Sequence, residues 1–208
     1  MNPATLIGAT ATRLTRRGDA GDDWPGQSLA EGAAGVALLH TELAAAGVGD
    51  WDAARAWLRQ ASASALSVEE NAGLDYGAPA MEFVVRTVVP YLPGFSAALA
   101  RLEAATDGVI RDRLSSAALR RSNQVLPTLR EFDLIRGLTG LGAVLLTRGP
   151  STPLLGEVLS YLVVLTEPVQ FDFCGIIVIT GVDDDAAGWA DLSLGQVDAI
   201  LLRITGRS

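Results

Sequence analysis

Lysine is absent from this chain, and cysteine, histidine and aromatic residues are scarce. All sixteen basic residues are Arg, while Asp and Glu number 24, so the formal net charge is −8. A chain this acidic offers little to the phosphate backbone of a nucleic acid, and we expect no nucleic-acid partner. The single cysteine, Cys174, excludes an intrachain disulfide and favours a reducing compartment, so the expected location is the cytoplasm.

Long hydrophobic runs are also absent. The longest apolar stretches, residues 154–166 and 174–180, are too short or too interrupted for a membrane span, which takes about 20 helical residues. The N-terminal residues lack a basic segment followed by an apolar one, so no secretory signal is expected. The sequence therefore predicts neither a membrane-spanning nor a secreted protein.

The residues that are abundant favour helices. Apolar residues make up 49% of the 208, but only 6% are aromatic, and Ala and Leu are prominent. Such a chain can bury a sizeable core through closely packed helices with small side chains. We expect an all-α fold in a single domain spanning residues 1–208.

One segment of the chain occurs twice. Residues 28–39 read Ser-Leu-Ala-Glu-Gly-Ala-Ala-Gly-Val-Ala-Leu-Leu, and residues 133–146 read Asp-Leu-Ile-Arg-Gly-Leu-Thr-Gly-Leu-Gly-Ala-Val-Leu-Leu. Such repetition is typical of helical arrays. Because Gly inside a helix costs roughly 1 kcal/mol relative to Ala, a pair on one helical face indicates close packing or a functional surface. The glycines predicted to have this structural role are Gly32, Gly35, Gly137 and Gly140.

Capping signals and breakers place the expected helices. Ser28 and Glu31 have capping-box spacing, Pro79 fits only a first helical turn, and Asp133 is a good N-cap residue. Asp107 and Gly108 are expected to separate two helices. The predicted helices cover residues 28–46, 50–66, 79–89, 95–106, 109–122, 133–148 and 153–166, which fits units of two helices.

The last forty residues are harder to assign, and residues 170–208 diverge from the repeat. The β-branched run at residues 173–180 is expected to form a short strand. Residues 191–202 begin Asp-Leu-Ser-Leu-Gly and look like a third copy of the repeated segment. Asp198 replaces its second Gly, so we interpret this copy as degenerate.

Four segments together resemble one protein family. They are residues 28–39, Gly73-Leu-Asp-Tyr-Gly-Ala-Pro-Ala80, Glu131-Phe-Asp-Leu-Ile-Arg-Gly-Leu-Thr-Gly-Leu-Gly142 and Tyr161-Leu-Val-Val-Leu-Thr-Glu-Pro168. In this order they resemble the N-terminal part of the lanthionine synthetase C-like proteins, the cyclases of lanthipeptide biosynthesis. The resemblance implies αα-hairpin repeats forming part of an α/α toroid. It also implies thioether ring formation, in which a cysteine thiol of a precursor peptide adds to a dehydrated Ser or Thr residue.

The resemblance implies only part of the family's site. Its candidate acid–base Asp corresponds to Asp133, for which a helix N-cap is the structural alternative. In complete members, two Cys and one His bind a zinc ion that favours the thiolate. The family's later catalytic His has no counterpart, because Gly195-Gln196 stands where Ala-His-Gly is expected. Cys174 precedes the region of the zinc ligands, and His40 lies in the first repeat helix, where we expect it to pack.

Three functional interpretations remain open at this point. The chain is a lanthionine synthetase C-like protein without zinc chemistry of its own, or a helical scaffold that binds a precursor peptide or a partner biosynthetic enzyme. The third interpretation is half of a split cyclase, completed by a C-terminal chain. In all three, we expect no cofactor in this chain and no independent cyclase activity.

Overall fold

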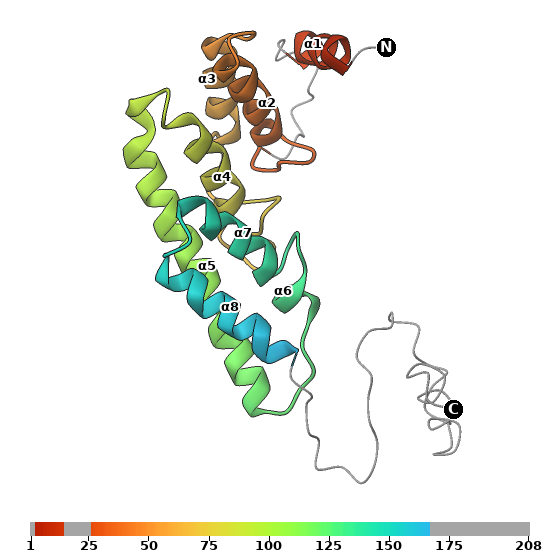
Figure 1. The fold of residues 1–208 in the computed structure, drawn as a ribbon, viewed down its shortest axis with the longest axis vertical. Coiled ribbons are helices and arrows are strands. Elements are labelled where there is room, and N and C mark those ends of the chain that lie inside the picture. Colours follow the sequence, from red (N-terminus) through yellow and green to blue (C-terminus); the bar gives the residue numbers. More distant parts are fainter. Residues whose placement is uncertain (1–2, 15–25, 167–208) are drawn as a thin grey trace, which may run out of the picture. The chain divides into compact units, whose positions relative to one another are not determined.

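A computed structural model describes residues 3–14 and 26–166 of this chain (Figure 1). All of these residues belong to the first of two units into which the chain divides, Met1–Val169. They form helices joined by loops, with no strand among them, so the predicted all-α fold is confirmed for this part of the chain. The predicted strand at 173–180 and the degenerate copy at 191–202 lie outside the described residues.

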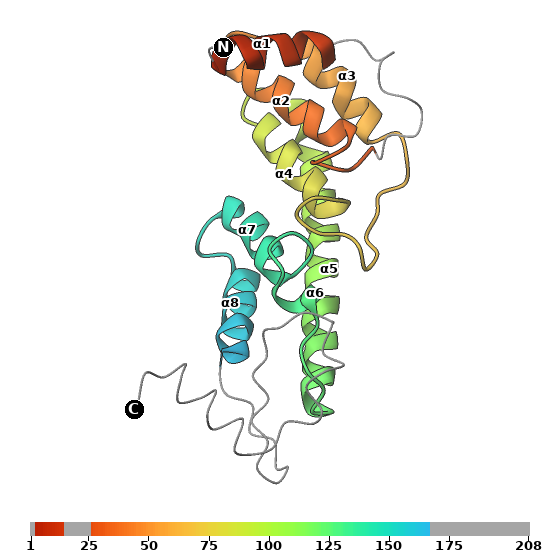
Figure 2. The ribbon, with the colours of Figure 1, turned by 90° about the vertical axis from the view of Figure 1, so that its right-hand side faces the viewer.

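Pairs of neighbouring helices follow one another along the chain (Figures 1 and 2). Helix α2 packs against α3, α4 against α5, and α7 against α8, while α4 also contacts both α2 and α7. The N-terminal helix α1 contacts α2. The elements are α1 (Pro3–Leu14), α2 (Ala33–Ala45), α3 (Trp51–Ala61), α4 (Ala78–Val88), the 3-10 turn η2 (Pro93–Phe95), α5 (Ser96–Ser122), α6 (Leu129–Phe132), α7 (Leu138–Arg148) and α8 (Pro153–Leu165).

Local sequence explains several helix starts. Pro79 lies in the first turn of α4, where its missing N–H costs no hydrogen bond. Proline also opens α8, at Pro153. The Asp50 carboxylate caps α3 by accepting from the N–H of Asp52 at 2.9 Å. These three starts agree with the prediction.

The starts predicted for the two repeated segments are wrong by several residues. Helix α2 begins at Ala33 rather than at Ser28, and α7 begins at Leu138 rather than at Asp133. The polar residue of each copy lies in the loop before the helix, and a glycine, Gly32 or Gly137, is the N-cap. Ser28 and Asp133 therefore do accept main-chain hydrogen bonds as the sequence predicts, but they close a turn in the loop and do not cap the helix.

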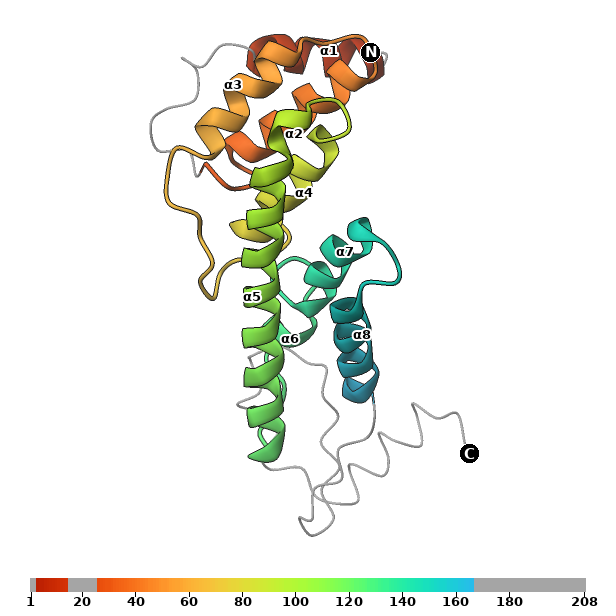
Figure 3. The same cartoon turned by 90° about the vertical axis from the view of Figure 1, so that its left-hand side faces the viewer.

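The predicted break at Asp107 and Gly108 is also wrong. Helix α5 runs unbroken for 27 residues through both positions (Figure 3). Asp107 accepts a hydrogen bond from Arg148 of α7 at 2.6 Å, and the next residues, Val109 and Ile110, are buried. Tertiary contacts on both sides of Gly108 thus outweigh its low helix propensity. Helices α1 and α6 had no counterpart in the prediction.

Two clusters of buried side chains stabilise the helix pairs. The first draws on α2, α3, α4 and the start of α5, and includes Trp57, Val84 and four alanines with little or no exposed surface. The second draws on α5, α7 and α8, and includes Ile110 and Leu141. Small side chains let these helices approach closely. None of the helices in residues 3–14 and 26–166 is long and apolar enough to cross a membrane.

Candidate functional site

The loop before α7 is organised around Asp133. Its Oδ1 atom accepts hydrogen bonds from the N–H groups of Ile135 at 2.8 Å and Arg136 at 2.6 Å. Its carbonyl accepts from the N–H of Gly137 at 3.0 Å. The hydrogen bond from Arg136 is the main cause of a lowered pKa for the Asp133 carboxyl, and the bond from Ile135 acts in the same direction. Asp133 is therefore a carboxylate at neutral pH and an acceptor that holds its own loop.

The loop before α2 repeats one side-chain bond of this arrangement with a different residue, whereas its carbonyl bond reaches the second glycine of the segment rather than the first. The Ser28 hydroxyl oxygen accepts from the N–H of Glu31 at 3.2 Å, three residues along, as Asp133 accepts from Arg136. The Ser28 carbonyl accepts from the N–H of Gly35 at 3.2 Å. A short polar side chain in the same place thus closes both turns.

The second glycine of each copy lies where no other residue fits. A Cβ atom at Gly35 would overlap the carbonyl oxygen of Leu29, and a Cβ at Gly140 would overlap that of Leu134. In both copies the blocking carbonyl is six residues earlier, on the loop that the polar residue closes. The first glycines, Gly32 and Gly137, are N-caps rather than interior helix residues.

Main-chain hydrogen bonds join the loops before α2, α4 and α7 in series. The N–H of Leu29 donates to the carbonyl of Asp75 at 2.8 Å, and the N–H of Leu74 donates to the carbonyl of Ile135 at 2.8 Å. In both bonds the donor is the Leu that lies three residues before the glycine N-cap of its loop. The acceptor is the residue directly after the corresponding Leu of the next loop. We call this series of equivalent bonds the loop ladder. The loop before α4, residues 73–77, is thus the middle member of three, and its N-cap is Gly77, at φ 76°.

Arg113 of α5 contacts the loop before α7 and the segment that leads into residues 73–77. Its guanidinium donates to the carbonyls of Glu70 at 3.1 Å, of Ala72 and of Arg136. Burial is the main cause of its lowered pKa, and the nearby charge of Arg130 acts in the same direction. Sequence reasoning missed Arg113, because an arginine in a long helix carries no signal that it binds carbonyls of distant loops.

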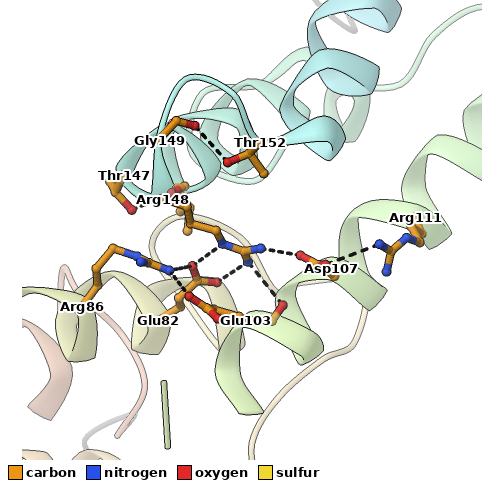
Figure 4. A network of polar contacts seen from close by, with 10 residues as sticks. Glu82, Arg86, Glu103, Asp107, Arg111, Thr147, Arg148, Gly149 and Thr152 are labelled. Atoms are coloured by element: carbon orange, nitrogen blue, oxygen red, sulfur yellow. Dashed lines mark hydrogen bonds and ion pairs between the residues drawn. The ribbon is translucent and has the colours of Figure 1, made fainter. Parts of the chain in front are cut away.

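A second cluster, also missed, buries a carboxylate between α4, α5 and α7 (Figure 4). Glu82 is fully buried and accepts two hydrogen bonds from Arg148, both at 2.7 Å, and one from Arg86 at 2.9 Å. Arg148 also donates to Asp107 at 2.6 Å, and Arg86 to Glu103 at 2.6 Å. Burial opposes the charge on Arg148, but its hydrogen bonds to Glu82 and Asp107 outweigh burial and raise its pKa. The sequence feature that could have indicated this cluster is Glu82 itself, the one acidic residue in the largely apolar sequence of α4.

A third cluster fixes α6, the short helix that precedes Asp133. Glu131 closes a capping box by accepting from the N–H of Thr128 at 2.9 Å. It also pairs with Arg120 of α5, Nε to Oε1 at 2.7 Å, and accepts from the hydroxyl of Tyr161 of α8. Burial is the main cause of the raised pKa of Tyr161, so its hydroxyl is a donor at neutral pH. These contacts hold the segment that leads into the Asp133 loop.

The described residues do not fit a zinc site. Within residues 3–14 and 26–166, no three side chains among His, Cys, Asp and Glu are placed to bind one metal ion. His40 is buried on α2, and Cys174 lies outside the described residues. We therefore derive no chemical step through zinc from this part of the chain.

We expect His40 to make the stability of the fold depend on pH. Burial is the main cause of its lowered pKa, opposed by a backbone hydrogen bond to Leu14. Below its ordinary pKa of 6.5 the unfolded chain binds a proton that the folded chain resists, so the free energy of unfolding should fall as pH drops from 7 to about 5. Urea unfolding followed by circular dichroism measures this loss. In His40→Gln the same pH range should show a smaller fall, and an equal fall in both proteins would contradict the prediction.

The chain was compared with protein-family models, with curated proteins and with solved structures, and none of the three comparisons gives a match. Any function assigned to it therefore rests on the residues and contacts described above. The strongest of these is the loop ladder, because it gives a common geometry to the Asp133 loop and to the loops before α2 and α4.

Proposed function

We propose that this chain is a lanthionine synthetase C-like protein in which residues 26–166 form αα-hairpin units of the family's α/α toroid. The loop ladder is the observation that carries the proposal. Three loops, each leading through a glycine N-cap into a helix, are joined by hydrogen bonds at equivalent positions. The packing of α4 against both α2 and α7 supports these three as consecutive inner helices.

The proposed function is to bind a precursor peptide without closing its thioether rings. Ring closure needs a thiolate nucleophile and a proton donor for the enolate carbon. Asp133 is ionised at neutral pH, so it is no proton donor there, and its low pKa makes it a weak base. Its hydrogen bonds to Ile135 and Arg136 support a role in holding the loop; a catalytic role for Asp133 stays a prediction.

A synthetic peptide that contains one dehydroalanine and one cysteine tests both parts of the proposal. With a fluorescein label, it should show a saturable rise in anisotropy when the full chain is added. Its free thiol, counted by alkylation and mass spectrometry, should disappear no faster than in the peptide alone, with or without added zinc. After dialysis, elemental analysis should find well below one zinc per chain.

The matched control is the same peptide with alanine in place of dehydroalanine and serine in place of cysteine, which separates recognition of the reacting groups from general peptide binding. Accelerated, zinc-dependent loss of the thiol would show that the chain is a cyclase. Absence of any saturable binding would contradict the scaffold function.

A further inference from the structure

Helix α1 buries little surface against the rest of the described chain. It lies beside α2 (Figure 2), and of residues 5–14 only Ala11 is buried and Leu14 half-buried, while the other eight are exposed. By comparison, α2 buries seven of its 13 residues. An element with so little buried surface opens at a lower free energy than the core helices do.

One carbonyl group fastens the C-terminal end of α1. The carbonyl of Leu14 accepts a hydrogen bond from Nε1 of Trp57, on α3, at 2.8 Å, and it also accepts from the ring of His40, on α2. Trp57 and His40 are buried, with 1% and 3% of their surface exposed. The Leu14 side chain packs against the first buried cluster. The last residue of α1 is thus held by two neighbouring helices at a single acceptor.

The second ring nitrogen of His40 is buried without a partner. Its Nε2 atom makes no hydrogen bond within the described part of the chain. The bond to Leu14 is therefore made by Nδ1, which carries the proton of the neutral ring. Protonation would add an N–H and a positive charge at Nε2, and a buried charge without an acceptor costs far more free energy than a neutral acceptor without a donor.

The charged side chains around α2 do not compensate a charge on His40. Helix α2 packs against α1, α3 and α4. Of the seven charged side chains on these four helices, four form ion pairs with one another and three are exposed. They are Arg13, Glu42, Asp52, Arg55, Arg59, Glu82 and Arg86. None of them contributes to the lowered pKa of His40, which burial causes and only the bond to Leu14 opposes.

We propose that α1 is a pH-sensitive latch, which stays docked on α2 and α3 while His40 is neutral and detaches when His40 takes up a proton. Detachment brings water to the ring at the loss of few buried contacts, whereas hydrating it from the side of α3 or α4 would open the first buried cluster. The detached state binds a proton near the ordinary pKa of 6.5, and the docked state resists it. The detached population therefore grows as the pH falls from 7 to about 5. The latch does not depend on which peptide the chain binds.

Hydrogen exchange of the full chain, followed by mass spectrometry, tests the latch. At pH 7.5 the amides of residues 7–14 should be protected. At pH 5.5, after correction for the intrinsic exchange rate, their protection should fall about three- to tenfold, the range that a detached state with an ordinary histidine pKa allows. Peptides from α4 should keep their protection. An unprotected α1 at pH 7.5, equal protection at both pH values, or an equal fall in α1 and α4 would overturn the proposal.

Two variants separate the titration of His40 from the docking of α1. His40→Gln stays neutral, so its α1 should be equally protected at both pH values. Trp57→Phe removes the other donor to the Leu14 carbonyl, so it should lower the protection of α1 at both pH values and leave their ratio unchanged. A full pH dependence in His40→Gln would assign the switch to another group and overturn the proposal. Undiminished protection of α1 in Trp57→Phe would show that the Leu14 carbonyl does not hold it.

Discussion

Gly140→Ala should lower the free energy of unfolding by about 2–4 kcal/mol. The new Cβ atom would overlap the carbonyl oxygen of Leu134, and it would lie 3.1 Å from the Cβ of Leu74. The loop cannot retreat freely, since Leu74 donates to the carbonyl of Ile135 and Asp133 holds the adjacent turn. Urea unfolding of the full chain measures the change.

Gly108→Ala is the matched control for this prediction. Gly108 is interior to α5, and a Cβ there would meet nothing within 4 Å. Alanine should therefore stabilise the helix by up to about 1 kcal/mol. The two substitutions add the same methyl group with opposite expected signs, so equal effects at both positions would show that the Gly140 loop is not packed as described.

Glu82→Ala should cost about 3–5 kcal/mol, because it removes the buried carboxylate that faces Arg148 and Arg86. Both guanidinium groups are largely shielded from water, with side chains 12% and 21% exposed. Asp107 and Glu103 remain as partners but cannot replace the bidentate contact with Arg148. The midpoint of urea unfolding should fall accordingly.

Two comparisons separate this effect from general loss of charge. Asp52→Asn removes one partner of the exposed pair with Arg55 and should change stability by less than about 0.5 kcal/mol. Glu82→Leu combined with Arg148→Met replaces the charged contact by apolar side chains and should recover part of the loss. If Asp52→Asn costs as much as Glu82→Ala, burial of Glu82 is not the cause.

The helical class and most helix positions could be predicted because they follow from local signals. Pro79 and Asp50 fix helix starts by backbone chemistry that depends on near neighbours alone. The break at Gly108 was mispredicted because propensity is local, whereas the contacts of Asp107, Val109 and Ile110 are made with distant segments.

The residues of the candidate site likewise fall into those that local sequence could predict and those that it could not. The motif glycines and Asp133 could be found because the segment that contains them occurs twice at a fixed spacing. That Asp133 and the first glycines, Gly32 and Gly137, lie before the helix rather than inside it could not be predicted. Arg113 and Glu82 were missed because each depends on partners far along the chain, such as Ala72 for Arg113 and Arg148 for Glu82. A single sequence contains no record of such pairs.

The loop ladder uses only main-chain groups, and this has a consequence for how such a protein can change over time. The two Leu donors, Leu29 and Leu74, and their acceptors keep the same pattern, although the helices between the loops differ, with α3 having 11 residues and α5 having 27. Insertions into the second helix of a pair therefore leave the spacing of the loops intact. Side chains in the loops can be exchanged, as Ser28 and Asp133 illustrate, without breaking the bonds that join them. The second helices of the pairs, α3, α5 and α8, can thus change in length and surface while the spacing between α2, α4 and α7 stays the same.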